Sequence, residues 1–207
     1  MRLAVNATRM QLLRLRKRLA IARRGHKLLK DKQDELMRQF MKLVKSVKGI
    51  RAEVEKGLHE AFQSFLLSRA TMPDQVVEEA ISMPSMKLRL KVSQRQIMSV
   101  RIPVLEPTVE GKIRCYGYAD TSGDLDISLK FLGDVLEQSL RLAEAEKTMQ
   151  LLADEIEKTR RRVNALEYTL IPNLQETIRY ITQKLAEMER SNLSRLMRVK
   201  SIIRREE

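Results

Sequence analysis

The residue types that most often carry chemistry are sparse in this sequence. It holds one cysteine, Cys115, and two histidines, His26 and His59. A single thiol cannot form an internal disulfide or a thiolate zinc cluster, and two imidazoles alone are a poor basis for a metal site. We therefore expect no bound metal and no cofactor.

A group of aspartates around Gly123 comes nearest to a metal-binding loop. Asp120, Asp124 and Asp126 lie close together in the sequence. Their order differs from that of a calcium loop, and the closing glutamate is missing. Acidic residues at this spacing are also typical of a helix start, and we favour that interpretation.

Other motifs of catalysis and nucleotide binding are missing. The sequence contains no G-x-x-x-x-G-K-[ST], no G-x-S-x-G and no H-E-x-x-H. Lys158 and the arginines at 160–162 could bind phosphate, but successive residues of a helix point in different directions and form no single patch. We expect no catalytic site, so the protein is not expected to be an enzyme by itself.

The composition favours long helices. The 207 residues include 7 glycines, 5 prolines, no tryptophan and 4% aromatic residues, whereas 43% of the residues are hydrophobic. Few turn residues beside enough apolar residues for a core indicate a mainly α protein. The longest apolar run is too short to cross a membrane, and the polar first residues lack the pattern of a signal peptide. This profile is typical of a soluble, cytosolic protein.

The first helix carries a seam of apolar residues with a period of 3.5, which is typical of a left-handed coiled coil. Thr8 resembles a helix cap, and Met72-Pro73-Asp74 should end the helix. His26 and Gln33 interrupt the seam, where they would fix the register or form bonds across it. The seam consists of Leu12, Leu15, Leu19, Ala22, His26, Leu29, Gln33, Leu36, Phe40, Leu43, Val47, Ile50 and Val54.

A second helical pattern runs from about residue 124 almost to the C-terminus. Pro172 interrupts it and should bend the helix, because proline removes a backbone donor. Since neither helix can bury its stripe alone, we expect the two to pair antiparallel with both termini at one end. The apolar positions include Leu132, Val135, Leu142, Met149, Ile156, Val163, Leu166, Leu170, Leu174, Ile178, Ile181, Leu185, Met188, Leu196 and Val199.

Between the helices the apolar period changes. Residues 74–82 predict a short helix, whereas 87–92, 97–102 and 113–118 predict strands. Pro103 should confine its strand to an edge. The predicted fold is a long antiparallel two-helix coiled coil with a small β-hairpin or sheet insert at the end away from the termini. Its segments are an N-terminal helix (1–71), the insert with its short helix (72–123) and a C-terminal helix (124–207).

The charge is concentrated at the N-terminal end. The chain has a net charge of +13, and residues 1–50 hold 15 basic and 3 acidic residues. Basic residues often solvate a helix face, but here the balancing acidic residues are missing. Such an excess predicts an acidic partner, which could be nucleic acid, a membrane surface or a protein cavity.

Two long motifs resemble those of a known family. The segments Asn6-Ala-Thr-Arg-Met10 and Arg24-Gly-His-Lys-Leu-Leu-Lys-Asp-Lys-Gln-Asp-Glu-Leu36 are similar to the N-terminal helix of the D subunit of the V/A-type rotary ATPases. The segments Glu155-Ile-Glu-Lys-Thr-Arg-Arg-Arg-Val-Asn-Ala-Leu-Glu167 and Ile171-Pro-Asn-Leu174 are similar to its C-terminal helix. The order of helix, insert and helix also agrees. Ala7 stands where the family has proline.

The resemblance implies a non-catalytic rotor shaft. Its termini would enter a hexamer of A and B subunits, the F subunit would clasp the coiled coil, and the membrane-side C/d subunit would hold its base. The complex would lie at the cytoplasmic face of the membrane and couple ATP synthesis or hydrolysis to H⁺ or Na⁺ transport. Together with the charge, the resemblance predicts hexamer contacts at Arg9, Arg14, Arg16, Lys17, Arg18, Arg23, Arg24, Arg195, Arg198 and Lys200.

Two other functions compete with this one. A basic coiled-coil scaffold that binds nucleic acid would use the same cations for phosphate contacts. The basic block contains one aromatic residue, Phe40, and no recognition module, which speaks against it. A helix lying on a membrane surface would need the apolar stripe that the coiled coil uses for packing. We therefore expect neither nucleic-acid binding nor membrane insertion.

Overall fold

The computed structural model describes residues 5–82, 85–112, 116–117 and 121–206. The chain forms two compact units. The terminal unit consists of Met1–Glu35 and Ile156–Glu207, and the central unit consists of Leu36–Glu155. The two chain ends therefore belong to one unit and the insert to the other. The division into segments 1–71, 72–123 and 124–207 stays an interpretation of the sequence.

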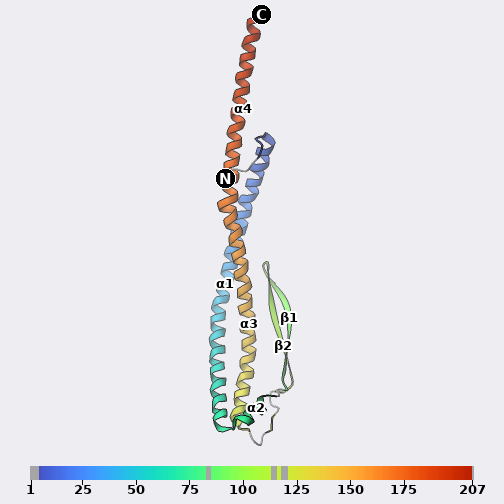
Figure 1. The fold of residues 1–207 in the computed structure, drawn as a ribbon, viewed down its shortest axis with the longest axis vertical. Helices are drawn as coiled ribbons and strands as arrows, with labels where there is room; N and C mark the ends of the chain where they lie inside the picture. Colours follow the sequence, from blue (N-terminus) through green and yellow to red (C-terminus); the bar gives the residue numbers. More distant parts are fainter. Residues whose placement is uncertain (1–4, 83–84, 113–115, 118–120, 207) are drawn as a thin grey trace. The chain divides into compact units, whose positions relative to one another are not determined.

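The first long helix, α1, spans Arg9–Thr71 and contributes to both units (Figure 1). Thr8 caps it as predicted, because its Oγ1 accepts a hydrogen bond from the backbone N–H of Gln11 at 3.3 Å. Pro73 follows two residues after the helix ends, at the predicted stop. Both boundaries are therefore set by local sequence.

The second long helical stretch consists of three consecutive elements. These are α3 (Gly123–Asn164), the π-helical segment η1 (Ala165–Leu170) and α4 (Ile171–Glu206). Part of α3 lies in the central unit, and the remainder lies in the terminal unit with η1 and α4. The change to a π-helix was not predicted from the periodicity.

Within each unit the paired helices run antiparallel. In the terminal unit Arg9 forms an ion pair with Glu189, and His26 Nε2 lies 3.2 Å from Glu167 Oε2. In the central unit Arg51 Nη2 lies 2.5 Å from Glu146 Oε1. Residues further along α1 therefore contact residues earlier on the second stretch. The predicted antiparallel coiled coil of mainly α class is confirmed.

The predicted seam of α1 packs as expected. Leu15, Leu36 and Val54 are buried, and the other seam positions are buried or half-buried. Buried residues keep the seven-residue repeat at Leu15, Ala22 and Leu36, with half-buried Leu29 at the remaining repeat position, and they keep it again from Val47 onward. Val47 lies eleven positions after Leu36, which is one heptad plus four residues. An insertion of four residues in a heptad pattern locally changes the winding of a coiled coil. This change in the repeat starts at Leu36, the first residue of the central unit.

The insert contains one short helix and one hairpin. Helix α2 spans Asp74–Ser82, as predicted. Strands β1 (Lys87–Ile97) and β2 (Val100–Glu110) pair antiparallel in a two-stranded sheet. The backbone N–H of Leu105 donates a hydrogen bond to Glu144 Oε2 of α3 at 3.2 Å, so β2 contacts the helix pair (Figure 1).

The prediction of one strand over 97–102 is wrong. Met98 and Ser99 form the hairpin turn between Ile97 and Val100, and Met98 has a left-handed φ of 53°. The turn was not recognised because it contains neither glycine nor asparagine, the usual residues of such turns. The third predicted strand, 113–118, falls mostly outside the described residues, and its described part, 116–117, is not a strand.

Candidate interaction surfaces

The predicted hexamer-contact residues all lie on the solvent-exposed surface of the terminal unit. Seven are on α1 and three are on α4, and all ten are exposed. Among the residues that the structure describes, Arg9 is the only one of the ten with an ion pair, to Glu189. Their positive charges are therefore available to a partner. The residues are Arg9, Arg14, Arg16, Lys17, Arg18, Arg23, Arg24, Arg195, Arg198 and Lys200.

Apolar residues lie among these cations on α1. Leu13, Ile21 and Leu28 are 59%, 69% and 69% exposed. They lie off the seam at helical spacing, beside Lys17 and Arg24. The sequence analysis missed them because it treated apolar residues only as core candidates. The signal that could have found them is a second apolar stripe out of phase with the heptads.

Among the described residues, the end of α4 has no packing partner within the terminal unit. Each residue from Ala186 to Arg204 is exposed, among them Leu193 and Met197. Leu196 and Val199, two apolar positions of the stripe that the second helix was expected to bury, are 65% and 52% exposed, so the expected burial is wrong there. The reason is geometric: α1 begins at Arg9, which pairs with Glu189, so α4 extends beyond the helix that could cover it.

Pro172 follows directly after the π-helical segment. The N–H of Ile171 bonds to the carbonyl of Leu166, five residues earlier, instead of four. In a regular α-helix the proline ring would clash with the carbonyl of residue 168. In the π turn the hydrogen bonds run over five residues instead of four, which is the pattern at Ile171 directly before the proline. The helix bend predicted at Pro172 stays a prediction.

His26 is a structural contact of the terminal unit. It lies on the seam, and its imidazole pairs with Glu167 of the π-helical segment across the two helices. Its side chain is 21% exposed, whereas the cations around it are largely exposed. The prediction that His26 bonds across the seam is confirmed.

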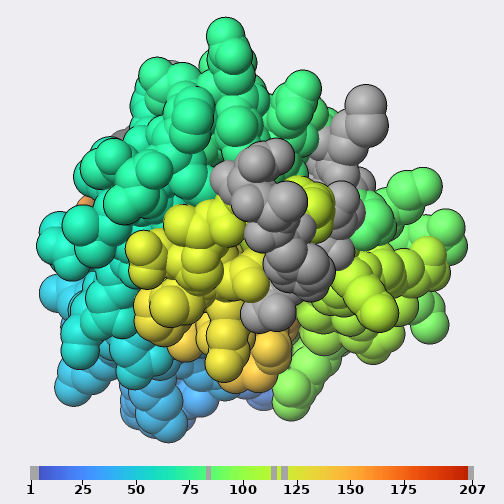
Figure 2. Space-filling view, turned by 90° about the horizontal axis from the view of Figure 1, so that it is seen from below, coloured from blue at the N-terminus to red at the C-terminus, as the bar shows by residue number. Residues whose placement is uncertain are grey.

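A second exposed surface lies at the end of the central unit, where α1, α2 and the start of α3 meet (Figure 2). Met72, Val77 and Leu125 form its buried core. An apolar hollow of about 220 Å³ lies between Ala61, Ile81 and Leu129. Several large apolar side chains remain exposed around this end of the unit: Phe62, Leu66, Leu67, Ile81, Phe131 and Leu132. Leu132, another apolar position of the stripe that the second helix was expected to bury, is 45% exposed, so the expected burial is also wrong there.

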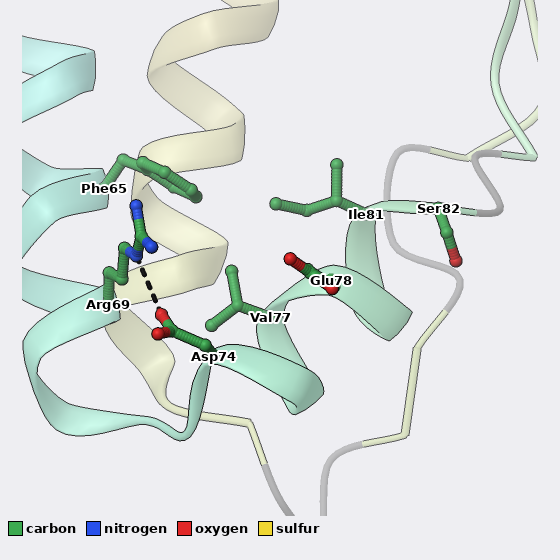
Figure 3. A pocket seen from close by; sticks show the side chains of 7 residues that line it. All are labelled: Phe65, Arg69, Asp74, Val77, Glu78, Ile81 and Ser82. Atoms are coloured by element: carbon green, nitrogen blue, oxygen red, sulfur yellow. Dashed lines mark hydrogen bonds and ion pairs between the residues drawn. The ribbon is translucent and has the colours of Figure 1, made fainter.

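A neighbouring hollow of about 420 Å³ is lined by Phe65 of α1 and residues of α2 (Figure 3). Arg69 Nε donates a hydrogen bond to Asp74 Oδ1 at 2.9 Å and so ties the end of α1 to the start of α2. The hydrogen bond and the charge of Asp74 raise the pKa of Arg69, with a smaller contribution from Glu78. The raised pKa reflects how closely Asp74 holds the Arg69 guanidinium, which as an arginine is charged at physiological pH in any case.

Two of the three aspartates lie at a helix start, inside the helix and not at the capping position that precedes Gly123, so their role as caps stays a prediction. Asp124 and Asp126 lie in the first turn of α3, and Asp126 accepts a hydrogen bond from the Tyr116 hydroxyl at 2.5 Å. Asp120 lies outside the described residues. In the described part of the chain, no group of three or more His, Cys, Asp or Glu side chains could hold a metal ion. No described helix has an apolar stretch long enough to span a membrane.

Comparisons with known proteins agree along almost the whole chain. A sequence profile of the ATP synthase D subunit family matches residues 11–201. The V-type ATP synthase D subunit of Fusobacterium nucleatum subsp. nucleatum is 53% identical over 208 residues, which cover 99% of each chain. That of Acetivibrio thermocellus is 55% identical over 203 residues, or 96% of this chain and 91% of its own. That of Clostridium novyi is 51% identical over 211 residues, or 100% of this chain and 98% of its own.

Proposed function

The chain belongs to the ATP synthase D subunit family, and from this membership we propose that it is the central rotor shaft of a V-type ATP synthase. In this role it has no catalytic site of its own. It transmits torque between ATP synthesis or hydrolysis in an A/B hexamer and H⁺ or Na⁺ transport in the membrane. The complex is peripheral to the membrane, on its cytoplasmic face.

The observation that carries the proposal is the surface of the terminal unit. Its ten exposed cations lie among exposed apolar side chains of α1 and the uncovered end of α4. A shaft in a protein cavity needs such a surface, since it must fit the cavity at several angles without one dominant bond. Exposed ion pairs contribute about 0–1 kcal/mol each, so many weak contacts allow rotation. The terminal unit is therefore proposed to enter the hexamer.

The central unit is proposed to hold the other partners. The exposed apolar side chains Phe62, Leu66, Leu67 and Ile81 form a surface of the kind that marks protein–protein contacts. We assign this surface to the membrane-side C/d subunit. The F subunit is proposed to clasp the coiled coil, at residues that we do not assign.

The test is binding of the purified chain to an A/B hexamer over a series of salt concentrations. Changing Arg14, Lys17, Arg18 and Arg24 together to glutamine should weaken binding and reduce its dependence on salt. Each single change should have little effect on affinity or on ATP hydrolysis by the reconstituted complex. Removing residues 191–207 should also weaken binding without lowering the unfolding temperature, since described side chains there are exposed.

A matched control removes the same charge from the central unit. Lys42, Lys45, Lys48 and Lys130 are exposed, and changing all four to glutamine should leave hexamer binding as in the unmodified chain. Equal affinities and salt slopes for both quadruple variants would contradict the proposed contact. The same two variants should then be titrated with DNA, because a nucleic-acid-binding scaffold would lose affinity in proportion to the phosphate contacts removed.

A further inference from the structure

The two outer edges of the hairpin differ in how well they are protected against pairing with a further strand. Ile97 and Val100 close the two-residue turn and form a hydrogen-bonded pair. Along an antiparallel hairpin such pairs alternate with pairs that do not bond to each other, whose N–H and C=O groups point away from the partner strand, toward the outer edge. Pro103, Leu105 and Pro107 of β2 all occupy outward positions. The two prolines have no N–H to offer, and that of Leu105 is bound to Glu144. The outer edge of β2 is thereby closed to a further strand.

The outer edge of β1 has no proline and no backbone N–H bound to a described side chain. Its outward positions in the same alternation are Leu88, Leu90, Val92, Gln94 and Gln96. None is proline, so each carries an N–H and a carbonyl directed away from β2. Within the described residues the sheet has two strands, and neither outer edge pairs with another strand. An open edge of this kind is a template for one more strand.

The side chains of β1 define what could pair with it. The strand holds four basic residues, Lys87, Arg89, Lys91 and Arg95, and no acidic residue. They share one face of the sheet, where Arg89 and Lys91 already pair with Glu110 and Glu106 of β2, so Lys87 and Arg95 are the two that form no ion pair with a described residue. Leu90 and Val92 lie on the other face and are 45% and 61% exposed. A complementary strand would carry carboxylates on the first face and apolar side chains on the second.

A second copy of the chain does not fit this edge. Pairing β1 with β1 of another copy would bring the four basic side chains of each strand to one face of the joined sheet, with no acidic residue on either strand between them. Like charges on neighbouring strands are destabilising, and lysines on an edge strand discourage such self-association. Like charges therefore disfavour pairing between two copies of β1, whereas the outward backbone groups of β1 stay available to a strand of another composition.

We propose that the outer edge of β1 docks an acidic, extended strand of a partner protein. The partner strand pairs with the outward backbone groups of β1 and becomes the third strand of the sheet. Main-chain hydrogen bonds supply the affinity in this mode of recognition, and alternate side chains supply the specificity. This surface belongs to the central unit and uses none of the ten cations of the terminal unit, so it does not depend on the proposed rotor function.

The experiment uses the full chain and a labelled ten-residue peptide of alternating glutamate and valine, with binding followed by fluorescence anisotropy. The unmodified chain should bind this peptide and should not bind a lysine–valine peptide of the same length. Val92→Pro removes one outward N–H of β1, in the manner of Pro107 on β2, and should weaken binding at least about tenfold. Val109→Pro, at an outward position of β2 with similar exposure, should leave binding unchanged.

A second variant tests the same edge without a proline, because Val92→Pro could also weaken binding by disturbing the hairpin. Lys87→Glu with Arg95→Glu keeps every backbone group and reverses two charges, so it should also weaken binding at least about tenfold. Three results would overturn the proposal: no binding by the unmodified chain, equal binding of both peptides, or equal loss in Val92→Pro and Val109→Pro. Helical circular dichroism should be the same for all variants.

Discussion

The terminal and central units are built from the same two helical stretches, but they differ in how the helix pair ends. In the central unit, α2 packs under the pair, and Met72, Val77 and Leu125 close its core. In the terminal unit, α4 continues past the start of α1 with its apolar side chains exposed. The central unit therefore has a closed core beneath its exposed side chains, whereas the described end of α4 is a single helix with no buried residue.

This difference shows that apolar periodicity alone does not define a core. Leu174 and Leu196 lie on the same helix, yet the first is 1% exposed and the second 65%. What separates them is the length of the opposite helix, since a stripe is buried only where another helix lies against it. Exposed apolar residues at the uncovered end are then the mark of an interface.

The largest expected effect tests this distinction directly. Leu174→Ala in the terminal unit and Leu125→Ala in the central unit should each lower the free energy of unfolding by about 2–5 kcal/mol, because each leaves a cavity. Leu193→Ala and Leu67→Ala, at exposed positions, should change it by less than about 0.5 kcal/mol. Urea unfolding followed by circular dichroism measures all four. A large loss at Leu193 would mean that the end of α4 is packed in solution.

The sequence predicted most of the fold for identifiable reasons. The ends of α1 could be predicted, because the seam, the cap at Thr8 and the stop before Pro73 all depend on local patterns. The turn at Met98 lacks the usual turn residues, and the π-helical segment has no periodic signature of its own. Neither could be derived from spacing.

The candidate surfaces were predicted only in part. The ten cations were predicted because charge is readable from the sequence, and all ten are exposed, whereas their contact with a hexamer stays a prediction. The apolar part of the surface was missed at Leu13, Ile21 and Leu28, and the apolar stripe at the end of α4 was expected to be buried. Both errors have one cause: burial depends on which residues lie opposite, and the sequence of one helix does not state where its partner begins.

The second prediction concerns Pro172 and the π-helical segment before it, a feature of the terminal unit that has no counterpart among the described residues of the central unit. Pro172→Ala should restore α-helical hydrogen bonding after Asn164 and stabilise the chain, by at most the cost of about 3 kcal/mol that proline has inside a helix. The stabilisation should appear in urea unfolding. Spin labels at the exposed positions Arg160 and Gln183 would report the bend. If Pro172 bends the helix, the distance between the labels should increase in the variant; an unchanged distance would refute the bend.

The third prediction compares two glycines of α1 in the central unit. A Cβ at Gly57 would lie 2.6 Å from Val135 Cγ2, whereas one at Gly49 would meet nothing within 4 Å. Gly57→Ala should therefore destabilise the helix pair by about 1 kcal/mol, since overpacking outweighs the gain in helix propensity. Gly49→Ala should stabilise it by up to about 1 kcal/mol. Thermal unfolding of the two variants should shift in opposite directions, and equal shifts would disprove the close approach.

The smallest effect concerns the polar contacts between the helices, compared at His26–Glu167 in the terminal unit, which is an ion pair only when the imidazole is protonated, and at the Arg51–Glu146 ion pair in the central unit. The Arg51 and Glu146 side chains are 58% and 37% exposed, so water screens their attraction. A double-mutant cycle with alanine should give a coupling of about 0–1 kcal/mol that declines in 1 M salt. His26 is only 21% exposed, so its coupling to Glu167 should fall less with salt. Equal salt dependence in the two cycles would show that both units expose their inter-helix contacts to solvent alike, and that they differ only in what covers their ends.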